Sequence, residues 1–140
     1  MELAGGLVLL LPNAAYDLWK RKISLIWTGI CGGAGMLWQI YMQTSVWALV
    51  GALIPCAVLL VAGFLRPGSV GMGDVLIIGA LGMWCGLEGV LWVLGVGCML
   101  LSLICIPLMI FGKVRRDTTV PLVPSLLAGL LVYWCLSIVG

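Results

Sequence analysis

The chain has 140 residues, of which 64% are hydrophobic and 9% charged, and its formal net charge is +2. Together with a mean hydropathy of +1.27, this composition predicts an all-α integral membrane protein with one domain over residues 1–140. The small positive charge gives no basis for nucleic-acid binding. No polar stretch is long enough for a separate soluble domain, and the 20 glycines are typical of helices that pack closely in lipid.

Six apolar stretches predict six transmembrane helices, because most of them approach the roughly 20 residues that a 30 Å hydrocarbon core requires. The first and fourth are short, and each carries an aspartate at one end. Glu2 precedes the first stretch and basic residues follow it, the reverse of a secretory leader, so we expect this stretch to remain as a span. In chain order the predicted spans are Leu3–Asp17, Ser24–Tyr41, Val46–Leu65, Asp74–Leu87, Gly89–Phe111 and Val120–Val139.

All basic residues fall into three of the predicted loops, which follow spans one, three and five. With six spans, these loops lie on the same side of the membrane. The positive-inside rule makes that side cytoplasmic and places both termini on the opposite side. Anionic membrane lipid is therefore an expected partner of these loops. The basic residues are Lys20, Arg21, Lys22, Arg66, Lys113, Arg115 and Arg116.

Two carboxylates, Asp17 and Asp74, adjoin long apolar stretches, and the predicted topology puts both at cytoplasmic helix ends. An ionisable group at the edge of a membrane segment is a functional-site hypothesis. Two neighbouring carboxylates share one proton, because like charges a few ångströms apart do not both ionise. Peptide hydrolysis by aspartates requires one ionised and one protonated carboxyl. Asp17 and Asp74 are therefore the predicted catalytic pair.

The loop that precedes Asp74 is the predicted substrate-binding segment. Its three glycines, Gly68, Gly71 and Gly73, permit unusual backbone angles and the close approach of another backbone. An extended substrate can add to such a loop through strand-like hydrogen bonds. Gly71 and Gly73 are the residues that we expect to contact the substrate.

A purely structural interpretation of the same residues stays open. Pro67 and the glycines break the helix, and Asp74 is then the N-cap of the next one. Asp17, taken alone, balances Lys20 and Arg21 at a helix end. The residues themselves do not decide between this interpretation and the catalytic one.

Three motifs follow one another along the chain. Asp17 lies six residues before Ile23, Gly71-Met72-Gly73-Asp74 is followed by Gly79-Ala80-Leu81-Gly82-Met83-Trp84-Cys85-Gly86, and Val120-Pro121-Leu122-Val123-Pro124-Ser125-Leu126-Leu127-Ala128-Gly129 comes last. Together they resemble the type IV prepilin peptidases and archaeal preflagellin peptidases, which are GxGD membrane aspartyl proteases. In that family an aspartate precedes a basic-Ile-Pro element, GxGD precedes A-x-L-G-x-W-x-G, and P-x-x-P-x-L-x-x-G opens the last helix.

This resemblance implies a six-helix peptidase of the plasma or inner membrane. The implied reaction is removal of a short leader, commonly after a glycine, from a prepilin-like protein at the cytoplasmic face. Asp17 and Asp74 would be its catalytic residues, without a cofactor. The chain resembles the short form that lacks the methyltransferase region with paired cysteines, so N-methylation is not implied.

The chain departs from the family pattern at two positions. Leu76 stands where the family usually has lysine two residues after the GxGD aspartate, and Ser24 stands where it usually has proline. Leu76 is the reason to keep an alternative, a non-catalytic membrane scaffold or binding protein that retains the peptidase fold. The presenilin type also pairs Tyr-Asp with GxGD, which Tyr16-Asp17 fits, but its members are much longer.

Other site classes have less support in the sequence. The six cysteines contain no CxxC pair and the chain has no histidine, so no metal site is expected. A small transporter would carry more polar residues along its spans.

Overall fold

The computed structural model describes residues 2–20, 24–68, 71–112 and 122–140. Across these ranges the chain is helical and contains no strand, which confirms the predicted all-α class. The helices are α1 (Glu2–Lys20), α2 (Leu25–Tyr41), α3 (Val46–Leu65), α4 (Met72–Ile110) and α5 (Val123–Val139). Several residues on which predictions rest lie outside the described ranges: Arg21, Lys22, Ile23, Lys113, Arg115, Arg116, Val120 and Pro121.

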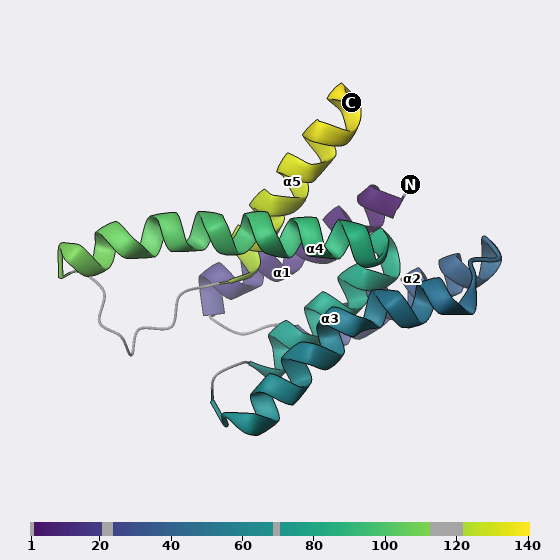
Figure 1. Ribbon diagram of the computed structural model, residues 1–140, viewed down its shortest axis with the longest axis horizontal. Helices are drawn as coiled ribbons and strands as arrows, with labels where there is room; N and C mark the ends of the chain where they lie inside the picture. Colours follow the sequence, from purple (N-terminus) through teal and green to yellow (C-terminus); the bar gives the residue numbers. More distant parts are fainter. Residues whose placement is uncertain (1, 21–23, 69–70, 113–121) are drawn as a thin grey trace.

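The predicted fourth and fifth spans form one element, so the described chain has five helices where six were predicted. Within α4 the backbone leaves the helical region at Gly86, with φ 71° and ψ −179°, a conformation that essentially only glycine adopts. Figure 1 shows α4 reversing its direction part-way along its length, so that it forms a hairpin of two helical arms. The predicted break was at Glu88, because hydropathy marks a charged residue and does not mark Gly86, two residues earlier.

The ends of two other helices differ from prediction in ways that matter for function. α1 runs three residues beyond Asp17 to Lys20, so this aspartate lies inside the last turn and the helix is not short. α2 begins after Ser24, whose hydroxyl accepts a hydrogen bond from the backbone N–H of Trp27 at 3.4 Å. Ser24 is thus a side-chain N-cap, which gives a physical role to one departure from the family pattern.

α4 lies at the centre of the molecule and contacts the other four helices. Its first arm is buried from Ile77 to Met83, and small residues there let the neighbouring helices approach closely. A Cβ on Gly82 would lie 2.4 Å from the carbonyl oxygen of Ala52 in α3. The indole Nε1 of Trp84 donates a hydrogen bond to the carbonyl oxygen of Cys31 in α2, at 2.9 Å. The Gly79–Gly86 motif is therefore a packing surface that ends in the reversal of α4.

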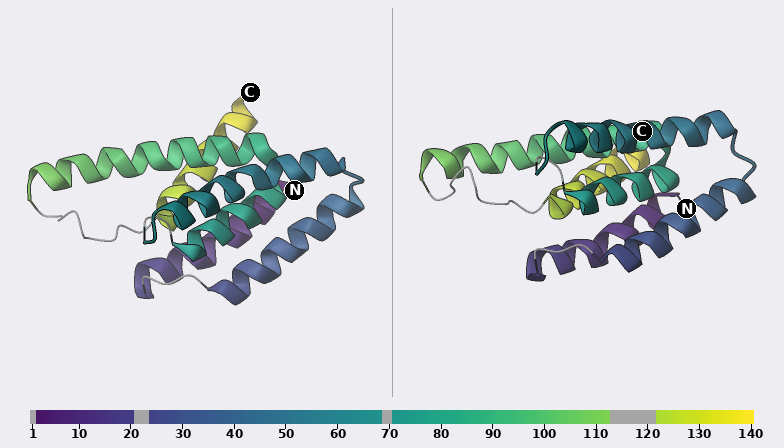
Figure 2. Two further views of the ribbon diagram at one scale, coloured as in Figure 1. Left: turned by 60° about the horizontal axis from the view of Figure 1, so that its bottom comes forward. Right: turned by 90° about the horizontal axis from the view of Figure 1, so that it is seen from below.

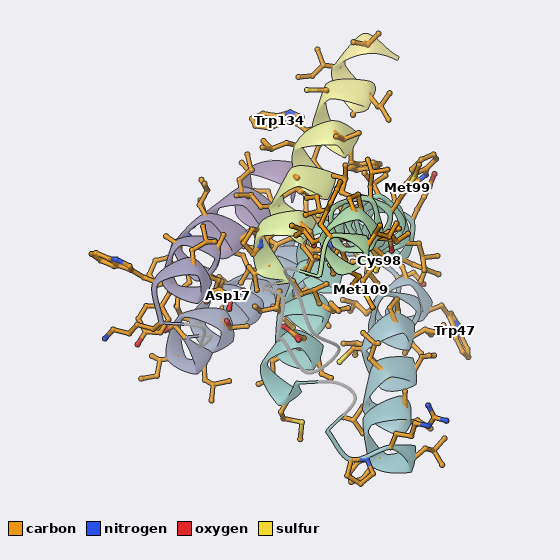
Figure 3. All side chains as sticks on the ribbon, turned by 90° about the vertical axis from the view of Figure 1, so that its left-hand side faces the viewer. Asp17, Trp47, Cys98, Met99, Met109 and Trp134 are labelled. Carbon is orange, nitrogen blue, oxygen red and sulfur yellow. The ribbon has the colours of Figure 1, made fainter. Side chains whose placement is uncertain are left out.

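The outer surfaces of the helices are apolar. α3 and α4 are each long and apolar enough to cross a membrane, with a mean hydropathy of 2.6, and α5 is a shorter apolar helix of 17 residues. Trp47 and Trp134 point away from the bundle (Figure 3), and Trp19 is also strongly exposed. Exposed apolar surface of this extent is typical of a protein that contacts lipid.

The helix ends separate into two groups (Figure 1). The C-terminal ends of α1 and α3 and the beginning of α4 lie toward one end of the molecule. The N-terminus, the turn between α2 and α3 and the reversal of α4 lie toward the opposite end. Figure 2 shows the same separation from two further directions. Asp17 and Asp74 therefore belong to the same end of the bundle.

Candidate active site

Asp17 lies on the buried face of α1. This face carries Leu9, Leu10, Asn13 and Ala14 at the three- and four-residue spacing that places side chains on one side of a helix, and Asp17 continues it by one turn. The aspartate is only 8% exposed. Figure 3 shows its carboxyl on the side of α1 that faces the rest of the bundle. The folding of an amphipathic helix is thus what takes this carboxyl out of water.

The carboxyl of Asp17 accepts a hydrogen bond from the backbone N–H of Val123, the first residue of α5. The N–H groups of a first helical turn have no partner within their own helix, and the helix dipole favours negative charge there. Asp17 satisfies one of these groups and is held in place by it. The hydrogen bond between Asp17 and Val123 was not predicted from the sequence. Pro124 did mark the beginning of α5, because proline is common in the first turn of a helix.

Asp74 lies in the first turn of α4, as the third helical residue, and is half-buried. Its backbone N–H donates a hydrogen bond to the carbonyl oxygen of Gly71 at 3.0 Å. Its carboxyl folds back over Gly71, because a Cβ built on that glycine would lie 3.1 Å from Oδ2 of Asp74. Gly71 is the N-cap residue, and its lack of a side chain keeps this space open for the carboxyl.

The structure places the two aspartates at the same end of the bundle, within electrostatic range of each other. α1 and α4 are in contact, and the charge of the Asp17 carboxylate acts on that of Asp74. Each carboxylate also lies at the N-terminus of a helix, Asp17 at that of α5 and Asp74 at that of α4. These two positive helix ends offset part of the repulsion between the carboxylates. In the described part of the chain, no group of three or more His, Cys, Asp or Glu side chains is arranged to hold a metal ion.

The predicted substrate-binding glycines differ in conformation from what was expected. Only Gly68 of the three has a positive φ, +87°. Gly71 has an extended backbone, with φ −70° and ψ 134°, and Gly73 lies inside α4. An unusual backbone angle, which the sequence permitted at any of the three, is thus found at Gly68 and not at Gly71, which is exposed. Contact of these two glycines with a substrate stays a prediction.

The purely structural interpretation of the aspartates is weakened at both positions. The N-cap of α4 is Gly71, not Asp74. Lys20 is exposed and its ammonium group lies 5.5 Å from the ring centroid of Tyr16, as a cation–π contact, while Asp17 is buried and bonded to α5. Arg21 lies outside the described residues.

An apolar groove of about 320 Å³ lies between α2, α3 and the first arm of α4. Leu76, two residues beyond Asp74, lies in its wall and is 47% exposed. Gly29 and Gly33 of α2 line it one helical turn apart, and a Cβ on either would meet no atom within 4 Å. The groove is therefore open enough to admit further apolar side chains next to Leu76.

Comparisons with models of known protein families, with curated proteins and with solved structures find no match. The resemblance to prepilin peptidases therefore rests on the three motifs of the sequence. What the fold adds is the proximity of the two aspartates on which those motifs centre.

Proposed function

We propose that this chain is a membrane-embedded aspartyl endopeptidase that removes a short leader from prepilin-like precursors at the cytoplasmic face of the plasma or inner membrane. The observation that carries the proposal is the position of Asp17 and Asp74 at the same end of the bundle, near enough for the charge of one to act on the other. The two residues come from helices far apart in the chain, and each carboxyl lies at a helix N-terminus. A pair that served only to cap helices would have no need to place two like charges together.

The reaction follows from one proton shared by the two carboxyls. The ionised carboxylate takes a proton from a water molecule, whose oxygen attacks the carbonyl carbon of the scissile peptide. The protonated carboxyl donates a hydrogen bond, and then its proton, to the carbonyl oxygen. When the resulting diol collapses, the C–N bond breaks, the leaving nitrogen takes the proton of the protonated carboxyl, and one diol hydroxyl gives its proton to the other carboxylate as the new C=O forms. The pair then again holds one proton between its carboxyls.

The membrane arrangement that we propose has six crossings, made by α1, α2, α3, the two arms of α4, and α5. The separation of helix ends in Figure 1 supports it. The end that carries Lys20 and Arg66 is then cytoplasmic by the positive-inside rule, and both termini are on the opposite side.

Labelling of single cysteines tests this topology. In a background with the six native cysteines replaced, we expect Lys20→Cys to react only from the cytoplasmic side and Gln43→Cys only from the other side. Both positions are exposed at helix ends. The measurement is blocking by a membrane-impermeant maleimide on oriented vesicles. Reaction of both positions from one side contradicts the six-crossing arrangement.

We propose that the groove beside Leu76 receives the apolar segment of the precursor that adjoins the cleaved bond. Gly33→Leu fills part of the groove, so KM for the precursor is expected to rise about tenfold, equivalent to about 1.4 kcal/mol of binding. kcat is expected to stay near that of the parent. The measurement is steady-state cleavage in detergent.

Gly95→Leu is the matched control. Gly95 is an exposed glycine in the second arm of α4, and a Cβ there also meets no atom within 4 Å. The same side chain is added outside the groove, and KM should not change. An equal rise of KM in both variants would show that the groove has no special role in binding.

The direct test of the function is incubation of the purified protein in detergent with a candidate prepilin, followed by mass spectrometry of the products. The expected product is a pilin shortened by its leader, formed by the parent but not by Asp17→Ala or Asp74→Ala. Leu76 favours a second candidate, a non-catalytic scaffold that retains the fold. Binding of the precursor without cleavage, equal in the parent and both alanine variants, would support the scaffold.

A further inference from the structure

Asn13 is the other polar side chain on the buried face of α1, and it is fully buried. Its Nδ2 donates hydrogen bonds to the carbonyl oxygen of Leu9 and to Oγ1 of Thr28, both at 3.0 Å. The carbonyl oxygen of Leu9 only accepts, so the amide nitrogen must face it and the orientation of the amide is settled. Oδ1 therefore points to the other side of the amide.

Oδ1 of Asn13 has no hydrogen-bond partner among the described residues. A buried acceptor without a donor costs roughly as much as a lost hydrogen bond, and more so in a membrane interior. An apolar residue at this position would avoid that cost. Thr28 does not need the amide as a partner for its own proton, because its hydroxyl donates to the carbonyl oxygen of Ser24 at 2.9 Å.

The helix spacing points to Asp17 of the proposed catalytic pair as the donor. Asp17 follows Asn13 by four residues on the same buried face, the spacing at which amide and carboxyl side chains of a helix interact. The shared proton makes Asp17 a donor whenever the proton resides on it. α2 contributes the buried thiol of Cys31, α4 contributes Asp74, and Tyr133 of α5 lies near Gly89 at the reversal of α4.

We propose that Oδ1 of Asn13 accepts a hydrogen bond from the protonated carboxyl of Asp17, which makes Asn13 a positioning residue for the catalytic pair. This inference rests on the proposed peptidase function. Val123 and Asn13 then bind the two states of the same carboxyl. The N–H of Val123 favours the ionised form, and Oδ1 of Asn13 favours the protonated form. A carboxyl held in both states can pass its proton and take it back without moving.

Infrared spectroscopy of the full chain in detergent tests this bond without any substrate. The protonated carboxyl of Asp17 gives a C=O band that Asp17→Asn removes. Asn13→Leu is expected to shift this band, because the carboxyl loses the acceptor of its proton. Gln39→Leu is the matched control: Gln39 is a buried amide of α2 that bonds Met83 and Thr44, and its loss should leave the band in place. An unshifted band in Asn13→Leu would overturn the inference.

Cleavage of a prepilin gives the second readout. Asn13→Leu is expected to lower kcat by roughly 10- to 100-fold with little change in KM, as for loss of a hydrogen bond to an ionisable group. Asn13→Asp should recover kcat in acid, where the new carboxyl is neutral and copies the amide, with its O–H toward Leu9 and its C=O toward Asp17. Asn13→Leu should show no recovery at any pH. A purely structural role predicts equal loss in both variants at every pH.

The two readouts separate the inference from the proposed function. If the band shifts in Asn13→Leu but the parent cleaves no prepilin, the hydrogen bond between Asn13 and Asp17 is supported and the peptidase function is contradicted. If the parent cleaves the prepilin but Asn13→Leu shows an unshifted band and an unchanged kcat, the peptidase function is supported and the role of Asn13 is contradicted.

Discussion

Replacing either Asp17 or Asp74 by asparagine is expected to abolish leader cleavage, with a loss of about 10⁴-fold or more in kcat. Each carboxyl performs a proton transfer that an amide does not, and neither carboxyl can perform both. The double variant should be no slower than either single one, because the two groups act as a unit. The measurement is single-turnover cleavage of a prepilin by the purified variants in detergent.

The folded state is the control for this result. Asparagine keeps the shape of the side chain, and its carbonyl oxygen can still accept the hydrogen bond from the N–H of Val123. Both single variants should therefore remain folded, with helical circular dichroism like that of the parent. Substantial activity in either one contradicts the shared-proton mechanism. Loss of folding in these variants would instead show that the aspartates have a structural role.

Replacing Gly82 by alanine is expected to destabilise the protein by about 1–3 kcal/mol, the usual cost of overpacking a tight core. The added Cβ would lie 2.4 Å from the carbonyl oxygen of Ala52, and this neighbour is backbone, which cannot swing aside as a flexible side chain does. α3 and the first arm of α4 must then separate. The measurement is the midpoint of unfolding by denaturing detergent.

Gly29→Ala is the matched comparison for Gly82. The substitution is the same and the residue is again inside a helix, but a Cβ on Gly29 meets no atom within 4 Å. The better helix propensity of alanine should stabilise this variant by up to about 1 kcal/mol. If both variants unfolded at the same midpoint, the close approach of α3 and α4 at Gly82 would be wrong.

The sequence predicted the helical class and the position of both aspartates at helix ends because both depend on simple patterns. Apolar stretches of sufficient length predict helices in lipid, and charges at their ends predict which ends lie together. Ser24 could also have been predicted as an N-cap, since serine before an apolar stretch is a common helix start. The reversal of α4 could not have been predicted from the sequence. Any of the 20 glycines can adopt a positive φ, and the packing of the other helices determines that Gly86 does so.

The surroundings of the aspartates were less predictable than the aspartates themselves. The partner of Asp17 is a backbone N–H, which every residue except proline carries and which no residue type marks. The groove beside Leu76 exists because α2 and α3 both pack on α4 and leave space between them. Such a space depends on how three helices cross, which hydropathy along the chain does not describe.

In the proposed peptidase, the bond between Asp17 and Val123 would also set the time at which activity starts. A ribosome makes α1 before α5, so Asp17 is synthesised long before Val123. Until α5 docks against α1 and α4, the Asp17 carboxyl lacks the group that orients it. Nascent chains that lack α5 therefore hold both aspartates but an incomplete site, so the proposed peptidase would begin to cleave only after α5 has been made.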